Sequence, residues 1–432
     1  MGGTRGNMRW WVIFWTFIVA ALSYLDRSNI SVAATPIQAA FNLSNIQLGT
    51  VFSAFAVGYA FTQPIAGRIA DRFGPRKVIF AGALWWSALT AACALVPPGY
   101  SWSLALLMVA RFTLGVGEAV IFPASNRLVA SWIPSQERGL ANGLIFAGVG
   151  FGAGIAPPLI TYLILVADWR LAFFVSAIIG VIVAVAWYVA IRDAPAYSAH
   201  VKPEEAAYIN AGLKSTLGEK PMKWSTILRD RQVLLLTLSY FGFGYVAFIF
   251  FTWLFKYLSS VRGLDLKASA LYAILPFIAM SLGSWLGGVL GDRLTRRFGK
   301  RIGRCGVAGG SLLLASIFVA LATQVADARL AAVVLAGGAG ALYMSISSFW
   351  SLSADFGGAS AGSVSGVMNM ANQIGSVVTA SLTAILADRF GWTSSFLVAA
   401  AICFVGAVLW LFIDPDHKMS AGETHPAEPR PT

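Results

Sequence analysis

Four ionisable residues stand in stretches of sequence that are otherwise apolar. Asp26 and Arg27 are neighbours in YLDRSN, and Arg111 and Glu118 are seven residues apart in RFTLGVGE. An arginine side chain stays charged and its planar fork fits a carboxylate through two hydrogen bonds, whereas a carboxylate can take up and release a proton. The pattern favours a site in which arginines bind an anion and carboxylates carry protons.

The two tasks can be coupled if the groups share one cavity. The spacing of Arg111 and Glu118 places them on one helix face, about 10 Å apart along the axis. A nearby cation favours the ionised form of a carboxyl group, so an anion that competes for the arginine would change the proton affinity of the acid. In the alternative, Asp26 pairs with Arg27 or Arg111, Glu118 pairs with another donor, and these buried pairs only fix helix packing.

The elements that hold these charges must lie in a membrane. The protein has 57% hydrophobic and only 12% charged residues, too few ionic side chains to cover a soluble surface. A membrane-spanning helix needs about 20 mostly apolar residues, and the sequence predicts an all-α membrane protein with twelve of them. The predicted spans are Trp10–Ala34, Ile46–Ile69, Val78–Leu95, Ser101–Pro123, Gly139–Leu165, Arg170–Ala190, Gln232–Leu258, Ala268–Leu290, Gly303–Gln324, Ala331–Ser353, Ala361–Leu386 and Thr393–Ile413.

The positive charge marks one side of that membrane. Most of the 31 lysines and arginines fall in the tails and in the loops on the side of the N-terminus. Cytoplasmic loops carry such an excess, so we expect both termini in the cytoplasm and a multi-pass plasma-membrane protein. The net charge of +12 therefore indicates the lipid bilayer rather than nucleic acid as a partner. The basic residues expected on the opposite side are Arg170, Lys256, Arg262, Lys267, Arg329 and Arg389.

The sequence offers no ligand set for a metal or cofactor. The three cysteines lie in separate apolar segments, which suits small buried side chains better than a disulfide framework. The three histidines lie in polar loop or tail segments, so a zinc site has no support. We expect no cofactor and no metal.

The chain repeats itself. GRIADR at 67–72 recurs as GVLGDR at 288–293, and Trp169 in DWRLAFFV matches Trp392 in GWTSSFLV at an offset of 223 residues. The same offset aligns NGLIFAGVGFG with SGVMNMANQIG. Glycine and alanine recur in any helical membrane protein, but several motifs at nearly one offset favour true repetition. Two repeated halves place a binding site at their interface near mid-membrane. The predicted units are an N-terminal six-helix bundle (1–191), a cytoplasmic linker (192–231), a C-terminal six-helix bundle (232–414) and a disordered cytoplasmic tail (415–432).

The repeated loop motif GRIADRFGPRK is typical of a gate. Its glycines allow close helix approach and a tight turn, and Asp71 can pair with an arginine or a helix N-terminus. A generic basic loop explains the arginines but not an aspartate at the same place in both copies, Asp71 and Asp292. We assign to the gate Gly67, Asp71, Arg72, Gly74, Arg76, Asp292 and Arg293.

Further candidates for the binding pocket are polar or aromatic residues inside spans. Asn369 and Asn372 share one helix face, and amides in hydrocarbon are costly unless they have partners. They can instead bond neighbouring helices. At the 223 offset they correspond to Phe146 and Val149, which gives the pocket one polar and one apolar wall. Two tyrosines complete the set, Tyr59 and Tyr24, for which simple packing is the alternative.

The loop motif, the repeat and the twelve spans resemble the major facilitator superfamily. YLDRSNISVA, RFTLGVGEAVIFPA, ERGLANGLIFAGVGFGAGIAPPL, TWLFKYL and SGVMNMANQIG resemble its anion:cation symporter family, whose members transport hexonates, hexuronates, glucarate, phthalate and related carboxylates. The resemblance implies the major facilitator fold. It also implicates Asp26, Arg27, Arg111 and Glu118 in proton coupling and substrate binding, and the Tyr59 region in substrate contact.

The same resemblance bears on the substrate. Sugar-acid members commonly carry Asn, Ser or Gln at the positions that align with Phe146 and Val149. This sequence departs from them, which favours an acid with an apolar or aromatic body.

The predicted function is proton-coupled import of a small organic anion, a carboxylate, by alternating access between two bundles of a monomer. A facilitator or an anion exchanger without proton coupling is the nearest alternative, and a membrane-embedded enzyme or sensor is a remote one. Against an enzyme, the sequence has no phosphate-binding glycine loop after a strand, no HExxH and no nucleophile elbow.

Overall fold

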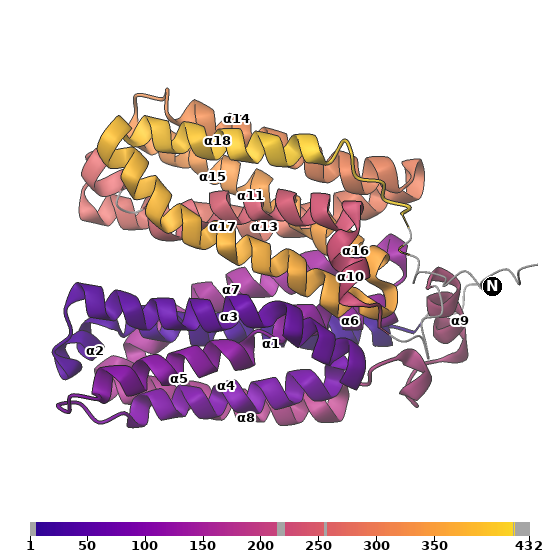
Figure 1. Cartoon of the computed structure of the whole chain (residues 1–432), viewed down its shortest axis with the longest axis horizontal. Helices are drawn as coiled ribbons and strands as arrows, with labels where there is room; N and C mark the ends of the chain where they lie inside the picture. The colour runs from indigo at the N-terminus through magenta and orange to yellow at the C-terminus, as the bar shows by residue number, and fades with distance from the viewer. Residues whose placement is uncertain (1–5, 214–220, 255–256, 418, 420–432) are drawn as a thin grey trace, which may run out of the picture.

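The structure is a computed structural model that describes residues 6–213, 221–254, 257–417 and 419. These ranges form two helical bundles that lie side by side, the first built from the N-terminal half of the chain and the second from the C-terminal half (Figure 1). The first bundle consists of α1 (Met8–Val32), α2 (Ala34–Phe41), α3 (Asn45–Phe73), α4 (Pro75–Leu95), α5 (Ser103–Glu118), α6 (Ile121–Trp132), the 3₁₀ turn Ser135–Glu137, α7 (Arg138–Val166) and α8 (Trp169–Ala190).

The second bundle follows a short linker. The linker holds the 3₁₀ turn Pro195–Tyr197, α9 (Pro203–Gly212) and α10 (Trp224–Arg229). The bundle itself consists of α11 (Arg231–Thr252), the π-helical turn Tyr257–Val261, α13 (Leu266–Phe298), the π-helical turn Arg301–Gly306, α14 (Val307–Ala322), α15 (Ala328–Met344), α16 (Ile346–Gly357), the 3₁₀ turn Gly358–Ser360, α17 (Ala361–Phe390) and α18 (Trp392–Leu409).

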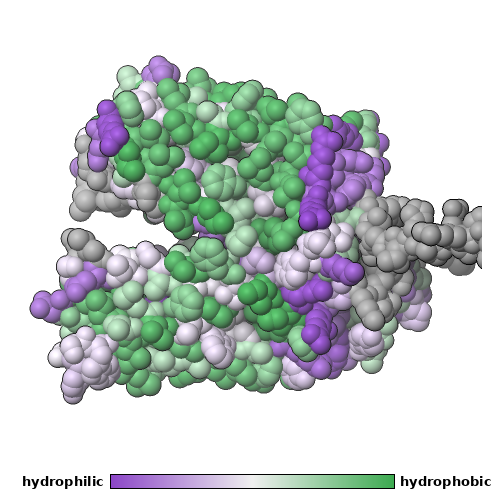
Figure 2. All heavy atoms as spheres, viewed as in Figure 1, coloured by the Kyte–Doolittle hydropathy of each residue, from purple (hydrophilic) through white to green (hydrophobic). Residues whose placement is uncertain are grey.

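These helices follow the predicted spans in order. Ten segments of the described chain are long and apolar enough to cross a membrane, and one of them, Ala328–Phe390, contains both the tenth and the eleventh predicted spans. The second predicted span lies in α3, which is not among the ten. Large apolar side chains on the outer faces, such as Ile182, Leu238 and Leu282, are at least half exposed, as lipid-facing residues are, and Figure 2 shows the resulting apolar surface.

The helix breaks inside two predicted spans, Ser101–Pro123 and Ala331–Ser353, although one apolar segment long enough to cross a membrane runs through each break. Pro123 carries no N–H, so the carbonyl group of Ala119 four residues earlier loses its helical partner, and α5 ends at Glu118. In the tenth span the break falls at Ser345, whose Oγ donates to the carbonyl of Leu342 and competes with the backbone. Glu118 is the last residue of α5, directly before this break.

The bundles meet at one end of the molecule. There α3 packs against α17 and α7 against α13, and both termini of the described chain lie at this end (Figure 1). Gly67 and Gly362 make the approach of α3 and α17 possible, since a Cβ on Gly67 would lie 2.0 Å from the Gly362 carbonyl oxygen. At the opposite end the two halves separate (Figure 2). We call the closed end, with its termini, the linker and the arginines of the loop motif, the basic end.

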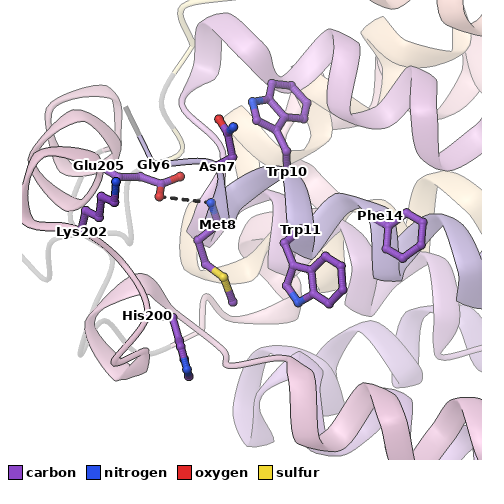
Figure 3. A pocket seen from close by; sticks show the side chains of 9 residues that line it. All are labelled: Gly6, Asn7, Met8, Trp10, Trp11, Phe14, His200, Lys202 and Glu205. Atoms are coloured by element: carbon purple, nitrogen blue, oxygen red, sulfur yellow. Dashed lines mark hydrogen bonds between the residues drawn. The ribbon is translucent and has the colours of Figure 1, made fainter. Parts of the chain in front are cut away.

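The linker is attached to the N-terminal bundle at the basic end. Glu205 of α9 is fully buried and accepts hydrogen bonds from the backbone N–H groups of Met8 and Arg9, each 3.1 Å long. Figure 3 shows the bond from Met8. The Arg9 guanidinium also pairs with Glu137 at 2.8 Å. Beside this contact lies a groove of about 540 Å³ lined by Trp11, Phe14 and other residues of α1 and the linker. Since all its lining residues belong to the first half of the chain and the linker, it is not a site between the bundles.

Candidate functional site

Arg27 and Glu118 form an ion pair inside the N-terminal bundle. Arg27 Nε of α1 lies 2.5 Å from Glu118 Oε1 at the end of α5, and Ser23 Oγ donates to the same oxygen at 2.7 Å. The guanidinium also lies over two aromatic rings, 4.0 Å from the centroid of Tyr59 and 4.7 Å from that of Tyr24. Within the described residues, neither Arg27 Nη2 nor Glu118 Oε2 has a hydrogen-bond partner. The pair is therefore buried but only half satisfied, which leaves groups for a ligand and a proton.

Asp26 and Arg111 lie deeper in the same bundle. Each is 3% exposed. Asp26 approaches Trp86, and the Arg111 guanidinium lies 4.8 Å from the ring centroid of Phe55. Among the residues that the structure describes, neither makes an ion pair within 4.0 Å. The structure thus contradicts the alternative in which Asp26 pairs with Arg27 or Arg111: the arginine beside Asp26 turns to Glu118 instead.

A polar strip leads from Arg27 to the C-terminal bundle. Tyr59 of α3 is 2% exposed beneath the guanidinium, and Gln63 follows one turn later on the same helix. Asn369 Nδ2 of α17 donates to Gln63 Oε1 at 3.0 Å, and Asn372 Nδ2 donates to Asn369 Oδ1 at 3.5 Å. The two predicted asparagines are thus brought together, and they face Gln63 across the bundle interface. Sequence reasoning missed Gln63, although an amide inside an apolar span was the signal that had selected both asparagines.

An aromatic wall also crosses the interface. Phe146 of α7 stacks on Phe122 of α6 with ring centroids 5.2 Å apart, and both rings contact Trp350 of α16, at 5.2 and 5.9 Å. Trp350 Nε1 donates to the hydroxyl of Tyr240 at 2.9 Å. Val149 lies one turn after Phe146 and is 5% exposed. The sequence pattern predicted Phe146 and Val149 but missed Phe122 and Trp350, since no periodicity says which aromatic residues of different helices will meet.

Both predicted aspartates of the gate bind helix N-termini of the opposite bundle. The carboxylate of Asp71, at the end of α3, accepts the N–H groups of Gly362 and Ser363 at 2.9 and 2.7 Å, and Ser363 Oγ donates to it at 2.6 Å. Asp292, near the end of α13, accepts the N–H groups of Gly139 and Leu140 at 2.9 and 2.6 Å. The positive end of a helix dipole favours such an anion. The repeated motif therefore holds the basic end closed twice.

The two copies differ in the cation beside the carboxylate. Arg304 Nη2 lies 2.7 Å from Asp292, whereas the guanidinium of Arg127 comes only within 3.8 Å of Asp71. Asp71 lies beyond the apolar part of α3, and its burial raises the pKa of its carboxyl group to about 6, against the opposing hydrogen bonds from Ser363 and Gly362.

The other gate residues support the loop rather than the contact between bundles. Gly74 has φ +87°, the left-handed conformation that glycine adopts without strain. Arg76 donates to the carbonyl of Tyr188 from Nε and Nη2, at 2.9 and 2.6 Å, and so anchors the loop to α8. Arg72 and Arg293 are exposed at the basic end.

Two repeated bundles that enclose buried charges between their helices define a secondary transporter. The family model "Major Facilitator Superfamily" matches residues 16–380 and 297–432. The chain therefore belongs to the major facilitator superfamily, a family of transporters and not of enzymes.

Curated relatives cover almost the whole chain. A protein named "Probable sulfoacetate transporter SauU" from Cupriavidus necator is 35% identical over 91% of both chains. The "Hexuronate transporter" of Escherichia coli is 30% identical over 97% of both. These are transporters of organic anions, so the predicted relation to the anion:cation symporter family is confirmed. Because the chain belongs to this superfamily and contains several membrane-spanning helices, it is a multi-pass plasma-membrane protein.

Solved structures share the fold. The proton:xylose symporter XylE superposes with a TM-score of 0.73 at 16% identity, over 94% of this chain and 96% of that one. The fucose:proton symporter FucP of E. coli superposes with a TM-score of 0.68 at 17% identity, over 93% and 98%. At these identities the likeness concerns the fold alone, and the predicted major facilitator fold is confirmed.

Proposed function

We propose that the protein imports a small organic anion together with protons, by alternating access. The observation that carries this proposal is the half-satisfied pair of Arg27 and Glu118 within the membrane. A charge at that depth is costly unless it is paired or faces water. Arg27 can release Glu118 only if another anion takes its place, and Glu118 can then remain buried only if it binds a proton.

The exchange of partners couples the two substrates. The arriving anion accepts hydrogen bonds from the Arg27 guanidinium, and the carboxylate it displaces takes up a proton from the same side. Asp26, which has no arginine within ion-pair distance among the described residues, is the second proton carrier, and Arg111 supplies the positive charge deeper in the bundle. When the anion leaves on the other side, Arg27 attracts Glu118 again and the proton is released.

The state of the gate determines from which side of the membrane the binding site can be reached. We assign the basic end to the cytoplasm, since its excess of lysine and arginine is the mark of cytoplasmic loops. The structure then corresponds to the state that loads from outside, with Asp71 and Asp292 bound to the helix N-termini of the opposite bundle. Release into the cell requires both contacts to break.

The aromatic wall narrows the class of anion. Phe122, Phe146 and Trp350 offer carbon surface, and a hydroxyl buried against carbon without a partner costs free energy, about 1–3 kcal/mol. We therefore expect a compact carboxylate or sulfonate without several hydroxyl groups. The names of two relatives specify one anion of each kind: sulfoacetate, which has no hydroxyl group on carbon, and hexuronate, which has several.

Uptake into proteoliposomes tests the proposal. Labelled sulfoacetate, succinate, phthalate, glucuronate and gluconate are offered with an inward proton gradient and without one. We expect one or more of the first three to accumulate above equilibrium only with the gradient. Uptake that merely equilibrates and ignores the gradient would support a facilitator, and uptake that requires an anion inside would support an exchanger.

A further inference from the structure

We propose that Gln63 is a second ligand of the transported anion and that it connects the bound anion to the C-terminal bundle. This inference rests on the proposed function, because it concerns the same site. It adds a residue of α3 that was not among the predicted site residues.

Gln63 is a buried donor without a partner. Its side chain is fully buried, and its Oε1 accepts the hydrogen bond from Asn369 at 3.0 Å. This bond fixes which end of the amide points toward α17. The other end, Nε2, is directed at the Tyr59 hydroxyl but makes no hydrogen bond of acceptable geometry among the described residues. A buried N–H group without an acceptor is costly, and such groups in native proteins call for an explanation.

A second donor without a hydrogen bond of acceptable geometry lies at the same tyrosine. Arg27 Nη2 is buried and unpaired, and its guanidinium lies 4.0 Å from the ring centroid of Tyr59. Gln63 is four residues after Tyr59 in α3 and therefore shares its helix face. A carboxylate or sulfonate group has at least two acceptor oxygens, so one such group at Tyr59 could accept from both donors. Because Tyr59 is only 2% exposed, its ring must move aside as the anion enters.

The position of Gln63 explains how binding in one bundle reaches the other. The helices cross closely here, since a Cβ on Gly366 would lie 2.5 Å from the Gln63 carbonyl oxygen. An anion bound to Nε2 polarises the amide and strengthens the bond that Oε1 accepts from Asn369. Arg27, the anion, Gln63 and Asn369 would then form one chain of hydrogen bonds across the interface.

Two substitutions separate ligand binding from a purely structural role. Gln63→Glu keeps an acceptor for Asn369 but replaces the donor by a negative charge, whereas Gln63→Leu removes both. If Gln63 binds the anion, both variants lose affinity by at least about tenfold, as expected for one hydrogen bond to a charged acceptor. If Gln63 only holds the helices together, Gln63→Glu binds like the wild type.

The assay is equilibrium binding of labelled sulfoacetate, succinate and glucuronate to the purified full chain. Gln47→Glu is the matched control on the same helix: Gln47 is exposed and its Oε1 accepts the N–H of Ser44 in a capping box, a role that glutamate also fills. Gln63→Glu should regain affinity as the pH falls, because a protonated carboxyl group donates again. Normal affinity of Gln63→Glu beside a binding wild type would overturn this inference alone. A wild type that binds none of the three anions would overturn the proposed function as well.

Discussion

The closed basic end depends on glycine at position 67, and Gly67→Ala should open it. A Cβ there would lie 2.0 Å from the Gly362 carbonyl oxygen and 2.9 Å from the backbone nitrogen of Ser363, whereas ordinary contacts begin at 3.4 Å. Both neighbours are backbone atoms, so no side chain can rotate away. Because the shorter distance, 2.0 Å, must grow to at least 3.4 Å, the helices α3 and α17 must separate by more than 1 Å.

That separation breaks the adjacent contact of Asp71. Its hydrogen bonds from Gly362 and Ser363 are 2.6 to 2.9 Å long, and the same displacement takes all three beyond hydrogen-bonding distance. Hydrogen bonds to a charged group contribute about 1.5 kcal/mol each at the lower end of their range. Hydrogen bonds from water to the exposed carboxylate replace part of this free energy. We therefore expect the equilibrium between the closed and open conformations to shift by about 2–3 kcal/mol, roughly 30- to 150-fold, toward the conformation open at the basic end.

Distances between paired spin labels measure this shift. Phe73 and Phe298 end corresponding helices of the two bundles and are 57% and 51% exposed, while the three native cysteines are buried and should label poorly. Gly49→Ala is the control on the same helix, since nothing lies within 4 Å of its Cβ position. In the Gly67→Ala protein the label distances should lengthen. Distances equal to those of the wild type and of Gly49→Ala would refute the link between this contact and the closed state.

Glu118→Gln and Asp26→Asn should abolish accumulation driven by a proton gradient, while counterflow exchange survives in at least one of them; undiminished accumulation in both would exclude them as proton carriers. Arg27→Lys keeps the charge but loses the planar fork, so the anion's Kd should rise at least about tenfold, and an unchanged Kd in correctly inserted protein would place the anion elsewhere. Val149→Gln adds a donor and an acceptor to the apolar side and should shift competition toward gluconate; a wild type that already prefers gluconate would contradict the apolar pocket. Burial raises the pKa of Asp71 to about 6 in the closed state, so the closed state binds the proton more tightly than the open one. It should gain population as the pH falls from about 7 to 4, and the spin-label distances of Asp71→Asn should show a weaker response, because the buried carboxyl group of Asp292 remains at the second contact.

The sequence by itself determined that the protein lies in a membrane, that its two halves repeat and which charged groups lie inside the spans. Apolar segments of about 20 residues specify membrane helices because the bilayer leaves backbone groups no other partner. The repeated motif located Asp71 and Asp292, and the cost of a charge in hydrocarbon singled out Arg27 and Glu118. All of these are local or periodic properties of the chain, which need no knowledge of how helices cross.

Only the tertiary structure decided which of these groups meet. Helix periodicity gives each residue a face, but the rotation and crossing of neighbouring helices choose its partner, so Arg27 turned to Glu118 although Asp26 is its neighbour in sequence. The bond from Asn369 to Gln63 joins residues 306 positions apart, and no local pattern encodes such a contact. The contact of Asp71 with Gly362 and Ser363 also belongs to the fold, because an aspartate can stabilise a helix N-terminus only where the packing of α3 against α17 brings the two together.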